Sequence, residues 1–304
     1  MQTQEAEIDG PAGRIAVADH GGDGPDVLLV HGANRTLLDW EPLRRELPDA
    51  RLVAYDLRGH GRSDVPADGD YGWDAHLADL DAVADAVKLT DPYVVGHSLG
   101  GMIAICHGRR RPECPGVVDL DGFGGGDPAL HPGMPPQEVV RRRAAQIAAL
   151  ASAPSVLSDE QVAAITAQVR QRAQAMGVDP ALEEAATRRS LAPEDAPEDA
   201  SAWRRKPSPA ALTELLAPLD GWNVFSVLRQ TRCPVLLVQA GQVPPMAQLP
   251  DEFRELNEAL IAGIAQELAT LSGPRLERLP DAGHLLHLQA AAEVAGLIRT
   301  FLKS

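Results

Sequence analysis

The chain has 304 residues, of which 44% are hydrophobic and 23% are charged, which is ordinary for a soluble protein with a large buried core. Its formal net charge of −15 argues against nucleic acid or an anionic membrane as a partner, because either would need a basic patch. The N-terminal sequence MQTQEAEIDG lacks the basic and apolar regions of a signal peptide, and no run approaches the ~18 apolar residues of a membrane span.

The first 120 residues alternate short β-forming runs with helical patterns. Residues 14–18 alternate apolar and polar side chains, as an antiparallel edge strand does. Continuous apolar runs predict buried strands at residues 27–30, 52–55, 93–95 and 117–120. Helices are expected between them, at residues 39–47, 73–88 and 99–110. This alternation predicts a parallel sheet with right-handed crossovers and helices on both faces.

The pattern changes after residue 122. Residues 137–229 show helical patterns rich in Ala, Arg, Gln and Leu, with no convincing strand, and the tract APEDAPEDA at 192–200 predicts a surface loop. Strands return at residues 235–239 and 275–279, with helices at 251–271 and 290–302. We therefore predict an α/β core, residues 1–127 and 230–304, interrupted by a helical insertion at 128–229.

The main functional motif is G-x-S-x-G at residues 96–100, between a predicted strand and a predicted helix. A sharp turn in this context strains the backbone of Ser98 and leaves room only for glycine two residues before and after it. The hydroxyl is then presented at the sheet edge beside a helix N-terminus, whose dipole favours a developing oxyanion. Ser98 is therefore the candidate nucleophile, and an incidental serine in a glycine-rich turn is the alternative.

Three further motifs accompany this turn: LLVHG at residues 28–32, YDLRGHGRSD at 55–64 and DAGH at 281–284. With them, the chain resembles the α/β-hydrolase family. The resemblance implies a mostly parallel eight-stranded sheet with a helical lid formed by the insertion. It also implies that His284 is the general base, and that the backbone amides of Ala33 and Leu99 form the oxyanion hole. The 55–64 loop is expected to serve packing.

The acid of the expected triad is not obvious. A Ser–His pair needs an acid that fixes the imidazole tautomer, and the resemblance places it most often after the strand at 235–239. That loop, AGQVPPM at 240–246, has no carboxylate, and Asp251 beyond it is expected to cap a helix. Some family members place the acid after the strand that is 117–120 here. Asp119 and Asp121 face the same side there, but only Asp121 reaches the rim. We select Asp121 as the acid, and a turn-holding role for it is the alternative.

The substrate is not named by the sequence. Aromatic and Met side chains near a covered serine favour an apolar or ring-containing molecule. We expect substrate contacts from Trp40, Met102, Phe123 and Trp222, and packing is the alternative for each of them. The basic clusters at 141–143 and 204–206 are expected to be solvated helix faces, with steering of an anionic group as the alternative. His284 and His287 are spaced i, i+3 without a third ligand, so no metal or other cofactor is expected.

We therefore expect a serine hydrolase of the carboxylic ester class that cleaves an ester, thioester or lactone of a small, largely apolar molecule through an acyl-enzyme. One alternative is a lyase, cyclase or cofactor-free oxidation that uses His284 as the base. Another alternative is a non-catalytic ligand binder. The three cysteines without a CxxC motif predict reduced thiols and a cytoplasmic protein. The expected partner is a small molecule, and the oligomeric state is not indicated.

Overall fold

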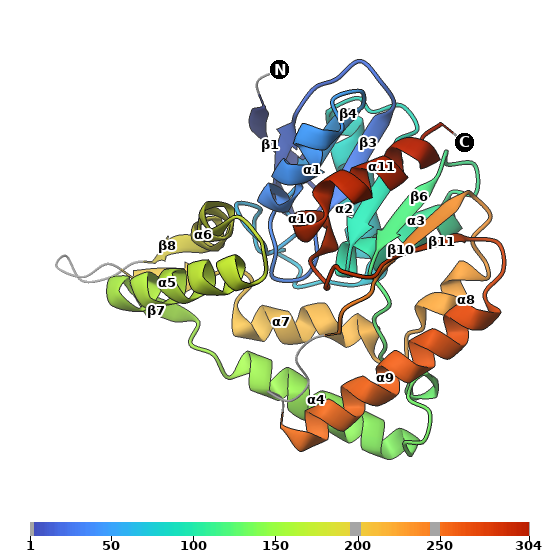
Figure 1. Cartoon of the computed structure of the whole chain (residues 1–304). Helices are drawn as coiled ribbons and strands as arrows, with labels where there is room; N and C mark the ends of the chain where they lie inside the picture. The colour runs from blue at the N-terminus through green and yellow to red at the C-terminus, as the bar shows by residue number, and fades with distance from the viewer. Residues whose placement is uncertain (1–2, 195–201, 244–249, 304) are drawn as a thin grey trace.

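A computed structural model describes residues 3–194, 202–243 and 250–303 of the chain. Its eight main strands are β1 (Gln4–Gly10), β2 (Gly13–Asp19), β3 (Asp26–Val30), β4 (Arg51–Tyr55), β5 (Tyr93–His97), β6 (Val117–Leu120), β10 (Val235–Ala240) and β11 (Arg275–Leu279). They form one sheet in the order β1-β2-β4-β3-β5-β6-β10-β11 (Figure 1). The β1–β2 and β2–β4 pairs are antiparallel, and the other neighbours are parallel. The predicted mostly parallel eight-stranded sheet is therefore confirmed.

Both faces of the central strands are buried, because successive side chains of a strand point to opposite faces. In β3, Leu28 and Val30 belong to one core cluster, and Val27 and Leu29 belong to the other. Helices α2 (Trp73–Ala86), α3 (Leu99–Arg110) and α8 (Val224–Leu228) contribute to the first cluster. The second cluster includes side chains of η1 (Leu37–Trp40), α1 (Glu41–Glu46), α10 (Leu286–Gln289) and α11 (Ala291–Phe301). Within the described residues, no helix has both the length and the apolar character needed to cross a membrane.

The segment between β6 and β10 contains most of the remaining helices, and Figure 1 draws much of it below and to the left of the sheet. Its elements are η2 (Pro128–Leu130), α4 (Pro136–Ala151), β7 (Val156–Ser158), α5 (Asp159–Ala175), α6 (Pro180–Arg189), β8 (Leu191–Glu194), β9 (Ala202–Arg205), α7 (Pro209–Leu216), η3 (Ala217–Leu219) and α8. We call residues 128–229 the insertion. Helix α9 (Asp251–Thr270) follows β10 and packs on α4 (Figure 1).

Three features differ from the sequence-based prediction. The insertion is not purely helical, because β7, β9 and β8 form a three-stranded antiparallel sheet. These strands have only three or four residues, which is too short for an alternating pattern to be recognised. The predicted edge strand at 14–18 is the inner strand β2, because the polar segment β1 pairs outside it. Part of the predicted loop at 192–200 is strand β8, and residues 195–200 lie outside the described residues.

Several histidines are buried in the core and are held neutral by that burial. Loss of hydration lowers the pKa of His31 to about 4 and that of His60 to about 3. Burial likewise lowers the pKa of His76 to about 3 and that of His107 to about 4. In the unfolded chain these groups bind protons near pH ~6.5. Between the folded and unfolded values, the unfolded state therefore holds more protons than the folded state.

Because of this difference, we expect the free energy of unfolding to fall as the pH is lowered below about 6.5. The slope should be about 1.4 kcal/mol per pH unit for each histidine that stays neutral in the folded protein. Urea unfolding between about pH 7.5 and 5.5 measures it. His76→Leu should reduce the slope by about 1.4 kcal/mol per pH unit, the contribution of one proton. His76 is a suitable choice because neither of its ring nitrogens has a hydrogen-bond partner among the described residues. A wild-type stability independent of pH over this range would contradict the prediction.

Candidate active site

Ser98 sits at a strained turn between β5 and α3. Its backbone has φ 54° and ψ −117°, in a region that side-chain-bearing residues rarely adopt. A Cβ atom on Gly96 would lie 2.0 Å from the carbonyl oxygen of Gly100, and one on Gly100 would lie 2.0 Å from that of Val30. The glycines of the motif are thus required by close backbone contacts between β5, α3 and the end of β3.

Two backbone amides beside Ser98 have no hydrogen-bond acceptor among the described residues. A Cβ atom on Gly32 would lie 3.1 Å from the Cβ of Ser98, so the loop after β3 runs next to the serine. The amides of Ala33 and Leu99 donate no hydrogen bond to any other described residue. The next amide, that of Asn34, donates to Nε2 of His60 at 3.2 Å and is therefore occupied. This arrangement leaves two N–H groups near Ser98 for an incoming oxygen.

His284 follows β11 and is paired with Asp121, which follows β6. The Nδ1 of His284 donates to Oδ2 of Asp121 at 2.7 Å. The other oxygen of this carboxylate accepts the Ala240 amide at 2.9 Å. The bond to Asp121 assigns the proton of the neutral imidazole to Nδ1, which leaves Nε2 as an acceptor. Within the described chain no hydrogen bond joins His284 to the Ser98 hydroxyl, and the His284 side chain is 48% exposed.

Two more histidine rings lie beneath His284. His97 is buried, its Nε2 donates to the carbonyl of His284 at 2.8 Å, and the two ring centroids are 4.8 Å apart. Burial, followed by the neighbouring rings of His287 and His284, lowers the pKa of His97. His287 is fully buried and donates from Nε2 to Asp39 at 3.3 Å. His97 thus anchors the His284 loop, and His287 is engaged with a carboxylate. Among the described residues, no group of three or more His, Cys, Asp or Glu side chains is arranged to hold a metal ion.

The other carboxylates considered from the sequence lie elsewhere. Asp119 is fully buried, accepts the Gly122 amide at 2.8 Å, and would be 1.9 Å from a Cβ on Gly101. Burial raises the pKa of Asp119 well above its usual range. Asp251 is the first residue of α9 and pairs with Arg254. Its expected role as an N-cap was wrong, because Pro250 occupies that position. In the loop that lacks a carboxylate, residues 244–246 lie outside the described residues.

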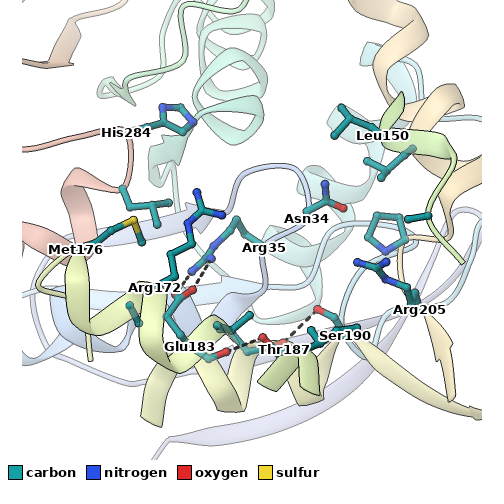
Figure 2. Close-up of a pocket in the computed structure, with 18 of the residues that line it drawn as sticks. Asn34, Arg35, Leu150, Arg172, Met176, Glu183, Thr187, Ser190, Arg205 and His284 are labelled. Carbon is teal, nitrogen blue, oxygen red and sulfur yellow. Dashed lines mark hydrogen bonds and ion pairs between the residues drawn. The ribbon is translucent and has the colours of Figure 1, made fainter. Parts of the chain in front are cut away.

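A cavity of about 890 Å³ lies between the insertion and the carboxyl edge of the sheet (Figure 2). The core lines it with Asn34, Gln242, Val243 and His284, among others. The insertion contributes a largely apolar wall that includes Leu150, Leu157, Val162, Ile165, Val169 and Leu212. Ser98 is partly exposed but is not one of the lining residues, although Asn34 and His284 are. The cavity therefore ends near the serine rather than enclosing it.

None of the four residues expected to contact substrate lines this cavity. Trp40 is fully buried in the core and lies 5.2 Å from the ring of His287. Phe123 stacks on Phe225, and Trp222 stacks on Trp73. Met102 is buried, and its Cε would lie 2.1 Å from a Cβ on Gly124. In this structure the four side chains pack in or against the core, and their contact with substrate stays a prediction.

A buried ion-pair network joins the insertion to the loop after β3. Arg35, two residues after Ala33, donates to both oxygens of Asp39 at 2.6 and 2.8 Å. It also donates to both oxygens of Glu183 on α6, at 3.0 and 2.5 Å (Figure 2). Although burial opposes its ionisation, the Arg35 guanidinium and His287 lower the pKa of Asp39. A second pair, between Arg189 and the buried Asp56, also ties α6 to the core. No local pattern in the sequence indicates these pairs.

The two basic clusters behave differently from each other. Arg141 and Arg142 lie on α4 and pair with Glu138, while Arg143 donates to the carbonyl of Gly125. The cluster at 204–206 is expected on a helix face, but Arg204 and Arg205 are the last residues of strand β9, and Lys206 follows them. Arg205 and Lys206 line the cavity, so the expectation of a solvated helix face is corrected for them.

Comparisons with known proteins identify the family. The sequence profile of the alpha/beta hydrolase family matches residues 27–297. The chain belongs to this family. A Bacillus subtilis (strain 168) protein, provisionally assigned as a 2-succinyl-6-hydroxy-2,4-cyclohexadiene-1-carboxylate synthase, is 35% identical over 110 residues, 36% of this chain and 40% of that protein. Protein phosphatase methylesterase 1 of Mus musculus is 30% identical over 125 residues, 38% of this chain and 32% of that protein.

The match to these two relatives thus covers less than half of their own lengths. Among solved structures, E-2-(acetamidomethylene)succinate hydrolase has a TM-score of 0.73 at 19% identity, with 100% of both chains covered. At this identity the likeness shows a shared fold. Hydrolases are therefore represented among the relatives and the structural neighbours of this member of the alpha/beta hydrolase family.

The close contacts at the serine turn predict that two helical glycines, Gly100 and Gly296, differ in how an alanine substitution changes the stability. Gly100→Ala should lower the free energy of unfolding by about 1–3 kcal/mol or more, because its Cβ meets the backbone of β3. Gly296→Ala in α11 meets nothing within 4 Å and should raise stability by about 0.5–1 kcal/mol. Urea unfolding of both variants measures these changes. Equal stability of the two variants would show that the turn tolerates a side chain.

Proposed function

We propose that this protein is a serine hydrolase of the carboxylic ester class, which cleaves an ester, thioester or lactone of a small, largely apolar molecule. The observation that carries the proposal is the Asp121–His284 pair at 2.7 Å, next to a strained Ser98 turn whose two nearby amides donate to no described residue. The apolar wall of the adjacent cavity supports a largely apolar substrate.

In the proposed acylation step, the Ser98 hydroxyl attacks the substrate carbonyl while Nε2 of His284 accepts its proton. Nε2 is available because Nδ1 donates to Asp121. The carbonyl oxygen becomes negatively charged and accepts hydrogen bonds from the amides of Ala33 and Leu99, at the positive N-terminus of α3. The tetrahedral intermediate then collapses, and His284 returns the proton to the leaving group.

In the proposed deacylation step, water replaces the leaving group. His284 removes a proton from the water as it attacks the acyl-enzyme, and then returns it to Ser98 as the acid product leaves. Asp121 stabilises the imidazolium in both steps. Its second hydrogen bond, from the Ala240 amide, fixes the orientation of the carboxylate. Hydrogen bonds between a catalytic serine and its base often form only with substrate bound, which is consistent with the absence of this bond between the described residues.

A second candidate is a non-hydrolytic reaction in which His284 acts as the base and Ser98 positions the substrate. Two observations favour considering it: Ser98 makes no hydrogen bond with His284, and one relative is provisionally assigned as a synthase. The two candidates differ in the covalent intermediate. Accumulation of an acyl-enzyme with an activated ester supports the hydrolase, whereas turnover of substrate without any acyl-enzyme supports the alternative.

The role of the serine is tested by Ser98→Ala. We expect this variant to lose about 10⁴-fold or more in kcat toward p-nitrophenyl esters, since the nucleophile is removed. Labelling by a fluorophosphonate, detected by mass spectrometry at Ser98, should disappear as well. Ser226→Ala, which changes an exposed serine on α8, is the matched control and should retain both properties. Labelling that persists in Ser98→Ala would contradict the proposed nucleophile.

The role of the acid is tested by Asp121→Asn. The amide keeps the size of the side chain but favours the wrong imidazole tautomer, so kcat should fall by about 10³–10⁴-fold. Asp251→Asn changes the other carboxylate considered from the sequence, which is exposed and paired with Arg254, and should change kcat little. Initial rates with p-nitrophenyl esters, together with urea unfolding as a check on folding, distinguish the two. A large loss in Asp251→Asn with little loss in Asp121→Asn would assign the acid to Asp251.

A further inference from the structure

The charge of the cavity wall is opposite to that of the protein. The chain carries 43 acidic and 28 basic side chains, so a wall drawn at random from its surface would be acidic. Among the described residues, the cavity is instead lined by four cationic side chains, from Arg35, Arg172, Arg205 and Lys206, and by one carboxylate, from Glu183. A cavity that concentrates positive charge within an anionic protein attracts and retains anions.

Two of these cations are already engaged within the fold. Arg35 is held by Asp39 and by Glu183, which neutralises the only carboxylate that the described residues place on the cavity wall. Lys206 donates from Nζ to the backbone carbonyl of Ser63. These contacts explain the positions of both side chains without a ligand.

The other two cations have no such explanation. The side chains of Arg172 and Arg205 form neither an ion pair nor a hydrogen bond with any other described residue. By contrast, Arg170, two residues from Arg172 on α5, pairs with Glu184. Figure 2 shows Arg172 on the same side of the cavity as His284, and Arg205 on the opposite side with Ser190. Both guanidinium groups therefore remain available to a ligand in the cavity.

We propose that the substrate is an anionic acyl compound, with an apolar chain or ring that carries a carboxylate, and that one of the two arginines, Arg172 or Arg205, binds this carboxylate. The proposal rests on the proposed function and names its substrate class. The planar guanidinium forms paired, charge-assisted hydrogen bonds with a carboxylate. The apolar side chains that line the cavity, which include Leu150 and Val169, would contact the hydrocarbon part. The reaction would release a dicarboxylic acid from its half ester, thioester or related acyl derivative.

The test compares two esters that differ only in charge. Mono-p-nitrophenyl suberate carries a free carboxylate, and p-nitrophenyl methyl suberate carries a neutral methyl ester in its place. For the wild-type protein, we expect kcat/KM to be about 10-fold or more higher for the carboxylate, since a charge-assisted hydrogen bond is worth that factor or more. High ionic strength should reduce this preference by screening. The corresponding adipate pair shortens the chain and tests how far from the ester carbonyl the carboxylate is bound.

Substitution then assigns the preference to the two arginines. In the double variant Arg172→Gln and Arg205→Gln, the ratio of kcat/KM for the two esters should fall by about 10-fold. Arg170→Gln is the matched control, because it removes a cation from the same helix that does not line the cavity, and it should leave the ratio unchanged. A wild-type ratio near one, or a preference that survives in the double variant, would overturn the proposal.

A binding measurement separates this inference from the proposed function. Isothermal titration of suberate into the Ser98→Ala protein should show binding that weakens about 10-fold when Arg172 and Arg205 are both replaced by Gln. If neither ester is hydrolysed, the proposed hydrolase function fails, and this titration still decides whether the cavity binds carboxylates. If esters are hydrolysed through Ser98 without a preference for the carboxylate, and suberate does not bind, the substrate class fails and the hydrolase proposal stands.

Discussion

The carboxylate of Asp121 is the point on which the geometry of the candidate site depends. One oxygen accepts the amide of Ala240 at the end of β10, and the other accepts Nδ1 of His284 from the loop after β11. A single side chain from β6 thus connects three neighbouring strands of the sheet at their carboxyl ends. Because both oxygens are used, the carboxylate cannot rotate without breaking a hydrogen bond. The position of His284 is therefore fixed by the register of the sheet as well as by its own loop.

Much of this arrangement could be predicted from the sequence, because the signals are local. Apolar runs identified the central strands. The glycines around Ser98 identified the turn, because a side chain at either position would meet nearby backbone atoms. The pairing partner of His284 could be proposed only through the resemblance to a family and the absence of a carboxylate in the loop after β10. The structure brings Asp121 to His284.

The remainder could not be predicted, because it depends on contacts between distant segments. Arg35 and Glu183 are 148 residues apart, and neither belongs to a recognisable motif. The cavity wall is formed by ordinary apolar helix residues, whose sequence pattern is the same whether they pack or bind. For the same reason, the sequence does not say whether the aromatic residues pack or bind, since hydrophobicity alone does not distinguish a core position from a cavity position. Strand β1 was missed because it is polar and largely exposed.

The insertion is held to the core by charges as well as by apolar contacts. Glu183 and Arg189 of α6 are both buried, and each faces an oppositely charged side chain of the core. Separating such a pair in a dry environment leaves uncompensated charge, so partial detachment of α6 is strongly disfavoured. Arg35 is two residues from Ala33, whose amide donates to no described residue. The ion pair between Arg35 and Glu183 of α6 therefore also holds the loop that carries this amide.

The loop after β10 lacks the carboxylate expected there, but it contributes side chains to the wall of the cavity. Gly241 and Gln242 are tied by their amides to the segment that follows β11, and Gln242 and Val243 face the cavity. In the proposed triad, this loop contributes only the backbone amide of Ala240, which any residue except proline can supply. Its side chains are therefore free to diverge with the ligand, so that recognition can evolve at this position while proton transfer is left intact.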